Sequence, residues 1–132
     1  MFFNVSNHPC NSDKTTWSAE QKATANQIAG KIIDIPMPQC TPDMPDQMLE
    51  TIARGLAKDL KGMGMADEKN AAMVAGHYIM TVLIVRELQK LGIDCYVGDS
   101  VRIAEEVPQD DGTIAIIHRF QFAGFRPYPK LC

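Results

Sequence analysis

Features that mark several common protein classes are missing from this sequence of 132 residues. The four cysteines, Cys10, Cys40, Cys95 and Cys132, lie far apart, and none stands in a CxxC or other metal-ligand spacing. The sequence therefore predicts no metal site. Lysine and arginine, 13 in all, are outnumbered by 16 acidic residues, which argues against a protein that binds duplex nucleic acid through a basic surface.

Long apolar runs are also missing. The longest one, within residues 78–85, is too short to span a bilayer and contains Thr81. The N-terminus shows no basic segment typical of a signal peptide, because Phe2 and Phe3 follow Met1 directly and polar residues soon interrupt the run. With thiols that we expect to stay reduced, these absences predict a cytoplasmic protein without a membrane segment.

What is present fits one globular domain. Apolar residues make up 45% and charged residues 22% of the chain, both ordinary for a folded protein. A chain of this length buries about two thirds of its unfolded surface. Because no repeat, low-complexity tract or linker divides it, we expect a single domain over residues 1–132 and no cofactor.

Strands and helices alternate in the first hundred residues. Runs rich in β-forming residues predict strands at residues 2–5, 32–35, 72–75 and 94–98. Apolar periodicity and capping signals, such as the capping-box spacing of Ser18 and Gln21, indicate helices at residues 18–29, 45–63 and 77–91. Residues 98–102 should form the loop that leaves the fourth strand.

The alternation then stops. Residues 102–107 and 113–122 are rich in β-formers, and Asp111-Gly112 between them is a strong hairpin turn signal. We expect an α/β fold, a small Rossmann-like and mostly parallel sheet flanked by helices, with a C-terminal antiparallel β-hairpin. Right-handed crossovers place the exits of the parallel strands at one sheet edge, where such folds bind ligands.

Polar side chains gather at these predicted exits, which are residues 6–9, 36–38, 76–77 and 99–102. Ser6, Asn7 and His8 offer a hydroxyl, an amide and an imidazole to a phosphate or ribose, although the same residues also suit a plain turn. Gly76 and His77 stand at a helix start, which favours an anion, or they form an ordinary strand-to-helix turn.

Two further segments carry alternatives. The helix at residues 77–91 is apolar on nearly all faces over its first two turns, which favours a subunit interface over a helix buried within one chain. Residues 113–132 contain no acidic residue, and Arg119 and Arg126 alternate with aromatic residues. This pattern fits phosphate and base binding, or an edge hairpin with one solvated basic side.

Several short motifs occur in an order that resembles a known family. They are NVSNHP, Trp17, the EQ pair, IIDIPMP, an AG at a strand end, Arg102 and FQFAGFRPY. Together they resemble the small stand-alone CRISPR-associated Rossmann-like proteins of type III systems, which are related to CARF domains and regarded as ring nucleases. Two features depart from that family: His77 stands where an acidic residue is expected, and residues 62–70 contain an insertion.

The resemblance implies a homodimer, joined through the helix at residues 77–91, that binds cyclic oligoadenylate and cleaves it without a metal through the substrate's 2′-hydroxyl. By it, Ser6, Asn7, His8, Gly76 and Arg102 match ligand-site positions. The residues expected to take part in cleavage are Ser6, Asn7, His8, His77 and Arg102. Those expected to contact the ligand are Ser6, Asn7, His8, Pro36, Gly76, His77, Thr81, Asp99, Ser100, Arg102 and Arg126. A non-catalytic sensor or sponge and a protein-interaction module remain the alternatives.

Overall fold

The computed structural model describes residues 1–64 and 68–132, and within them the chain forms one five-stranded sheet with helices on both faces. The elements are β1 (Phe2–Val5), α1 (Ala19–Ala29), β2 (Ile32–Ile35), α2 (Asp46–Met63), β3 (Ala71–Val74), α3 (Tyr78–Lys90), β4 (Asp94–Pro108) and β5 (Ile114–Pro127). The strand order is β2-β1-β3-β4-β5, with the first four strands parallel and β5 antiparallel to β4. The expected α/β fold is confirmed.

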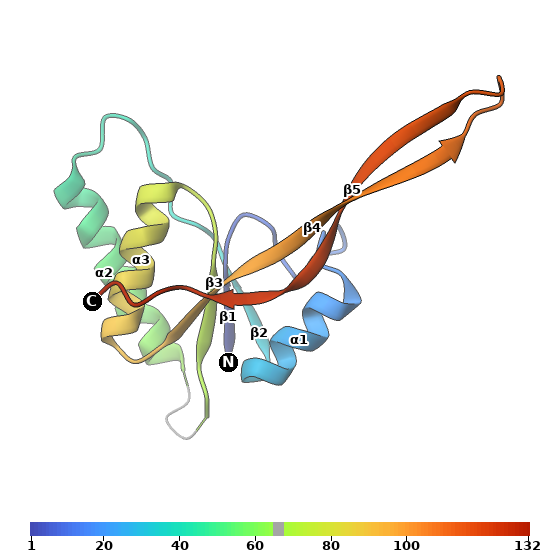
Figure 1. The fold of residues 1–132 in the computed structure, drawn as a ribbon. Coiled ribbons are helices and arrows are strands. Elements are labelled where there is room, and N and C mark those ends of the chain that lie inside the picture. Colours follow the sequence, from blue (N-terminus) through green and yellow to red (C-terminus); the bar gives the residue numbers. More distant parts are fainter. Residues whose placement is uncertain (65–67) are drawn as a thin grey trace.

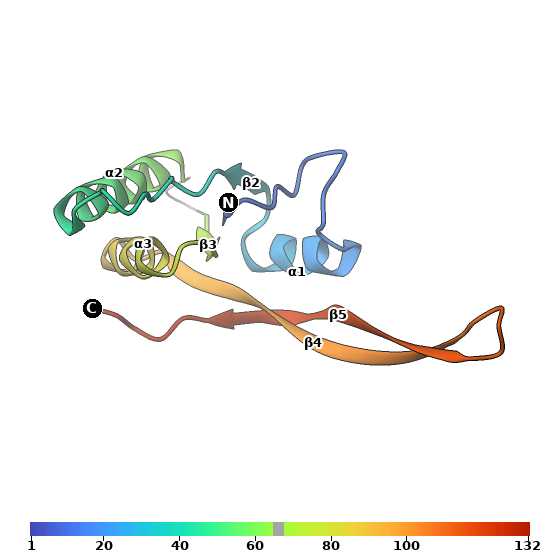
Figure 2. The same cartoon turned by 90° about the horizontal axis from the view of Figure 1, so that it is seen from above.

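Two cores lie on the two faces of the sheet, α1 covering one face and α2 with α3 covering the other (Figures 1 and 2). Alternation along β1 divides its side chains between them. Phe3 and Val5 pack with residues of α2 and α3, whereas Phe2 packs with Trp17 and Ala25 on the α1 side. Central strands buried on both faces explain why these runs are apolar at successive positions.

Local signals place the helix ends where they were predicted. The Ser18 side chain accepts a hydrogen bond from the Gln21 amide at 3.0 Å, and Gly30 ends α1 with φ of 79°, a conformation that favours glycine. Strand β3 begins at Ala71, one residue earlier than expected. None of the helices in the described ranges is long and apolar enough to cross a membrane. Of the insertion at residues 62–70, residues 65–67 lie outside the described residues.

One structural prediction was wrong. Residues 98–102 do not form a loop, because β4 runs without interruption from Asp94 to Pro108 and pairs with β5 over nearly its whole length. A register shift between Asp99 and Ser100 is the one irregularity in this pairing. Gly98, Asp99 and Ser100 are turn-forming residues, but the hydrogen bonds to β5 outweigh that local tendency.

The outer part of this hairpin leaves the rest of the molecule, as Figures 1 and 2 show. We call residues 100–122 the arm and the other described residues the body. The predicted turn at Asp111-Gly112 is confirmed at the tip of the arm, where Gly112 has φ of 85° and the Gln109 amide donates to the Thr113 carbonyl. The arm rises past the carboxyl edge of the sheet, on the side of α1.

Candidate functional site

The strand order defines a switch point between β1 and β3. From β1 the chain turns to β2 through α1 on one face, and from β3 it turns to β4 through α3 on the other. Loops that leave neighbouring strands toward opposite faces create the position where open α/β sheets bind ligands. Residues 6–9 and 75–77 are the two exits at this point, and we call them the switch-point site.

The backbone of the first exit is fixed by buried polar groups. Asn4 Nδ2 donates to the His8 carbonyl at 2.9 Å, and Trp17 Nε1 donates to the same oxygen at 3.0 Å. Ser6 Oγ donates to Asn4 Oδ1 at 2.7 Å and accepts from the His8 amide at 3.2 Å. The Ser6 hydroxyl is therefore used within the protein, while the side chains of Asn7 and His8 remain exposed.

Asp34 ties this loop to the neighbouring strand. Its carboxylate accepts from Asn4 Nδ2 at 2.9 Å and from the amides of Cys10 and Asn11, each at 2.8 Å. Burial alone would raise the pKa of Asp34, but these hydrogen bonds outweigh it and lower the pKa below its ordinary value. The loop thus rests on an ionised carboxylate.

Sequence reasoning missed Asn4 and Asp34. Each is the third residue of a four-residue strand whose other members are all apolar, and the two are register partners across β1 and β2. A polar residue at the same place in two otherwise apolar strands was a readable signal of a shared hydrogen bond, because polar groups inside a sheet require partners.

The second exit ends in an N-cap formed by a histidine. His77 Nδ1 accepts from the Met80 amide at 3.4 Å, at the start of α3. In a neutral imidazole with Nδ1 as the acceptor, Nε2 carries the proton. His77 thus offers an N–H donor beside the exposed end of a helix, and it has an orienting partner that the sequence did not reveal.

Gly76 is explained by packing. A Cβ atom at this position would lie 2.8 Å from Cγ of Met37, which is buried after the end of β2. The glycine therefore makes room for the Met37 side chain of the same protein, and not for a ligand. Pro36, also predicted to contact the ligand, is exposed at the end of β2.

Thr81 in the first turns of α3 stands apart from the other predicted residues. The residue is 7% exposed, and within the described ranges its hydroxyl has no hydrogen-bond partner. A buried hydroxyl without a partner costs free energy, so it marks a place where a further group would be accommodated favourably.

The predicted residues of β4 and β5 lie at the base of the arm and on it. Arg126 Nε donates to Asp99 Oδ2 at 2.6 Å, so these two residues pair with each other. Arg102 lies farther out, opposite Phe120. Of the predicted exits, those of the neighbouring strands β1, β2 and β3 are brought together, whereas residues 99–102 continue into the arm. That Arg102, Ser100 and Arg126 contact a ligand stays a prediction.

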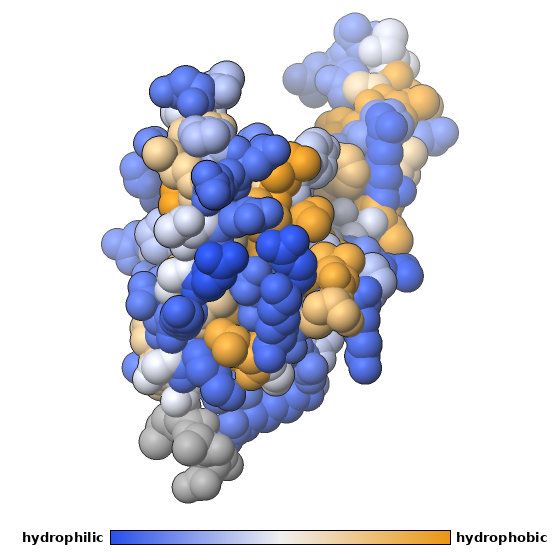
Figure 3. Space-filling model, turned by 90° about the vertical axis from the view of Figure 1, so that its left-hand side faces the viewer, coloured by the Kyte–Doolittle hydropathy of each residue, from blue (hydrophilic) through white to orange (hydrophobic). Residues whose placement is uncertain are grey.

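The α3 helix is apolar on more than one side, but only part of it is available for an interface. Met80, Ile84 and Leu88 are fully buried in the α2 and α3 core. Tyr78, Ile79 and Val82 lie on the solvent side, with Tyr78 88% exposed. We call these three residues the α3 face. Figure 3 shows a mostly hydrophilic surface over this side of the body, with separate apolar patches and a more apolar arm behind it.

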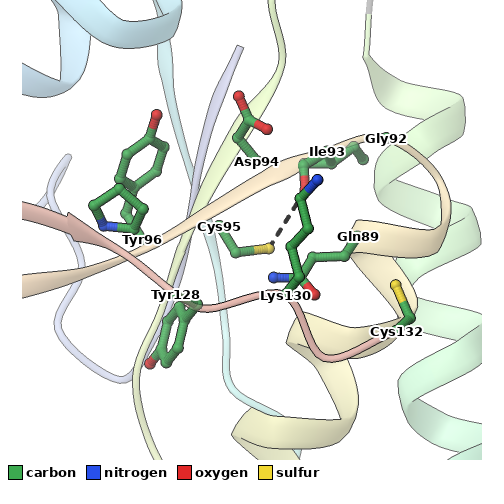
Figure 4. A pocket seen from close by; sticks show the side chains of 10 residues that line it. Gln89, Gly92, Ile93, Asp94, Cys95, Tyr96, Tyr128, Lys130 and Cys132 are labelled. Atoms are coloured by element: carbon green, nitrogen blue, oxygen red, sulfur yellow. Dashed lines mark hydrogen bonds between the residues drawn. The ribbon is translucent and has the colours of Figure 1, made fainter.

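A cavity of about 570 Å³ lies at the amino end of β4 (Figure 4). The C-terminal tail forms one wall, held by Gln89, whose side chain donates to the Pro129 carbonyl and accepts from the Leu131 amide. Burial raises the pKa of Cys95 in this cavity to about 12, so its thiol is inert. Ligands of open α/β sheets bind at the carboxyl ends of the strands, and the switch-point site is therefore the better candidate.

Comparisons with known proteins identify a family. Residues 1–126 match the model of the uncharacterized protein MJ1673 family, and the chain belongs to it. No curated protein and no solved structure matches the chain. Across the part of the chain that the structure describes, no group of three or more His, Cys, Asp or Glu side chains is placed to hold a metal ion.

Proposed function

We propose that this member of the MJ1673 family is a ring nuclease that binds a cyclic oligoadenylate at the switch-point site and cleaves it. The observation that carries the proposal is the strand order, which puts the SNHP exit and the Gly76-His77 exit on the two sides of one switch point. The substrate class comes from the resemblance to the CRISPR-associated ring nucleases of type III systems.

The groups at this site suit an anionic nucleotide. The N-terminus of α3 presents unpaired amides and the positive end of the helix dipole, and His77 adds an N–H donor there. Asn7 and His8 are exposed on a loop whose backbone is already fixed. A site that is ordered before the ligand arrives loses less entropy on binding.

The proposed ligand also favours a homodimer. A cyclic oligonucleotide of even ring size has approximate two-fold symmetry, and a two-fold dimer presents the same exits twice around one axis. The α3 face begins directly after His77, so contact between two α3 faces would bring two switch-point sites together. Ile84 is no part of that contact, because it is fully buried within one chain.

Cleavage would use the substrate's own 2′-hydroxyl. Its oxygen forms a bond to the adjacent phosphorus, the bond from phosphorus to the 5′-oxygen breaks, and a 2′,3′-cyclic phosphate remains. The proton of the 2′-hydroxyl passes to a base, and the leaving 5′-oxygen receives a proton. Alignment of the attacking and leaving oxygens is the largest contribution open to such a site, up to about 7 to 11 kcal/mol in favourable intramolecular reactions.

The geometry divides the roles of the two histidines. His77 would donate from Nε2 to the phosphate as charge builds, because its Nδ1 is occupied by the Met80 amide. The exposed imidazole of His8 would then be the base. Asn7 would hold ribose or phosphate oxygens, Ser6 would position His8 through the loop, and Arg102 would contribute only where the ligand extends toward the arm.

The test is incubation of the purified protein with cyclic tetra-adenylate, with and without EDTA, followed by chromatography of the products. We expect linear products ending in a 2′,3′-cyclic phosphate, unchanged by EDTA. His8→Ala and His77→Ala should slow cleavage by about 10²- to 10⁴-fold. Asn7→Ala should slow it as well, whereas the matched control Asn26→Ala on exposed α1 should not. Absence of both binding and turnover would overturn the proposal.

A second candidate is a sensor or sponge that binds the same ligand without turnover. One observation supports it: the hydroxyl of Ser6 is engaged within the protein by Asn4 and the His8 amide. Calorimetric binding of cyclic tetra-adenylate, with the ligand recovered intact after long incubation, would establish this function instead.

A further inference from the structure

The arm has no cover within its own chain. Of residues 100–122, only Val107, Ala115 and Phe122 are even half-buried. A two-stranded ribbon with both faces in water is marginally stable at best. Even so, Ile114, Ile116 and Phe120 on one side of it are 62%, 63% and 75% exposed. Such a row of large apolar side chains on a soluble chain indicates a binding surface.

These residues share one face of the ribbon. Residues directly opposite each other in an antiparallel pair point to the same side, and every second pair does so. We call this side the arm face, and its pairs are Ser100 with Phe122, Arg102 with Phe120, Ala104 with His118, Glu106 with Ile116, and Pro108 with Ile114.

The arm face continues the α1 core into solvent. The ring of Phe122 lies 5.0 Å from that of Phe125, which in turn lies 5.2 Å from Phe2 in the core beneath α1. The apolar layer thus begins under a helix and runs outward beyond it. Its outer end needs a cover that the chain does not supply.

The arm face is complementary to itself. A two-fold axis through the Ala104–His118 pair, perpendicular to the strands, sets two arms face to face in opposite directions. Arg102 then faces the partner's Glu106, and Phe120 faces the partner's Ile116. At the axis Ala104 meets the partner's Ala104, and His118 meets the partner's His118.

We propose that two copies of this protein associate through their arm faces in this antiparallel arrangement. A groove of about 250 Å³ at the base of the arm supports it. Thr16, Ser18 and Gln21 at the start of α1 line one side of the groove, and Phe120 and Phe122 line the other. The same axis brings the partner's Ile114 over Phe122, so the tip of the partner's arm enters this groove.

Charge favours a second copy over a nucleic acid. The arm carries Arg102 and Arg119 against four acidic residues, Glu105, Glu106, Asp110 and Asp111, a net charge of −2. Arg119 is also paired with Glu105 on the opposite face. Phosphates would be repelled by such a surface, whereas a second arm presents its glutamate to Arg102 and its arginine to Glu106.

The size of the contact sets the concentration at which it forms. Nine residue pairs make a ribbon about 30 Å long and about 10 Å wide, so two arm faces bury less than a standard interface. We therefore expect a concentration-dependent dimer. Because the arm lies on the α1 side and the α3 face on the other, this association is independent of the proposed nuclease dimer.

Charge reversal tests the arrangement in sedimentation velocity runs over a range of concentrations. Arg102→Glu alone and Glu106→Arg alone each place like charges opposite each other, so association through the arms should weaken at least tenfold. The double variant Arg102→Glu/Glu106→Arg exchanges the partners and should restore it. The double variant Glu105→Arg/Arg119→Glu, on the opposite face, should sediment as the wild type.

A cross-linking experiment fixes the position of the axis. With a short bis-maleimide, Ala104→Cys should yield a covalent dimer. Mass spectrometry should show that the two introduced thiols are joined. Ile103→Cys on the opposite face should give no such dimer. Equal cross-linking of both variants, or single charge variants that sediment as the wild type, would overturn the proposal. The proposal would also be overturned if the arm variants changed binding to single-stranded RNA but did not change the mass of the protein in solution.

Discussion

The strands of the body and those of the arm both carry large apolar side chains, but they differ in what covers them. In the body, Phe2 and Phe3 of one strand are both fully buried because helices lie on both faces of the sheet. In the arm, Ile116 and Phe120 are just as apolar but are 63% and 75% exposed, because no helix lies over the ribbon (Figure 2). Apolar β-forming residues therefore indicate a strand, and tertiary structure determines whether their side chains are covered.

Polar groups differ between the two regions as well. In the body, Asn4, Ser6 and Asp34 form a partly buried network in which each side chain has partners. In the arm, Arg119 and Glu105 pair at the surface with both side chains well exposed. Exposed ion pairs contribute about 0 to 1 kcal/mol, whereas a buried donor left without a partner costs about 1 to 3 kcal/mol.

The largest difference in the free energy of unfolding is expected when an isoleucine is replaced by aspartate in each region. Ile84→Asp places a carboxylate in the centre of the α2 and α3 core, where the native side chain is 0% exposed. We expect a loss of at least about 4 kcal/mol in the free energy of unfolding. Ile116→Asp in the arm should change it by less than about 0.5 kcal/mol. Urea denaturation followed by circular dichroism measures both, and equal losses would show that the arm belongs to the core.

The same difference explains how much the sequence predicted. The three helices and strands β1, β2 and β3 follow from local signals, such as the Ser18 cap, the stripe of α2 and the apolar β1, and these were placed to within a residue or two. Strand β5 was expected to end at residue 122 but reaches Pro127. The continuous β4 was missed because its course at Gly98 to Ser100 depends on hydrogen bonds to β5, more than twenty residues away in sequence.

The candidate site was predicted in part for a related reason. The exits of β1 and β3 could be named from the sequence, because parallel strands end at one edge. Which side chains stay free there could not, since Ser6 is engaged by Asn4 and Gly76 accommodates Met37. The Gly76 contact joins the ends of separate strands, and the Ser6 contact depends on how the backbone turns after β1, so composition or spacing does not report them.

The second effect in size concerns hydrogen bonds. Asn4→Ala removes the donor to both the His8 carbonyl and Asp34, groups that are partly buried. We expect a loss of about 1 to 3 kcal/mol in the free energy of unfolding. Thr113→Ala removes the hydrogen bond from the Thr113 hydroxyl to Asp111 at the exposed tip of the arm and should cost less than about 0.5 kcal/mol. Thermal melts of both variants make the comparison, and a larger loss for Thr113→Ala would contradict it.

The third effect is a pH dependence of the free energy of unfolding, to which we expect a carboxylate of the body to contribute and one of the arm not to. Hydrogen bonds lower the pKa of Asp34, against its burial, and hydrogen bonds from Thr113 lower that of Asp111. A carboxyl group whose folded pKa lies below its unfolded value contributes stability above the unfolded pKa, near 3.8, and loses it as the pH falls through the folded pKa.

The measurement is the unfolding free energy between pH 7 and pH 2.5. Asp34→Asn should reduce stability at pH 7 and flatten the decline in acid. Asp111→Asn should leave the curve nearly unchanged. Asp111 lies in the exposed arm, so its hydrogen bonds contribute little to the free energy of unfolding of the core. A curve for Asp34→Asn that runs parallel to that of the wild type would show that the carboxylate contributes nothing through its charge.

The smallest effect is expected at Cys10, which lies close to the switch-point site but inside the body. Burial raises the pKa of its thiol, and Asp34 nearby raises it further against the opposing effect of Lys22. A thiol in that state is a poor nucleophile. Iodoacetamide should therefore modify the exposed Cys132 well before Cys10, and Cys10→Ser should cleave cyclic tetra-adenylate at the wild-type rate. Loss of cleavage in Cys10→Ser with ligand binding intact would instead make Cys10 a catalytic residue. A buried thiol of the body would then be reactive because it lies near the site, despite its burial.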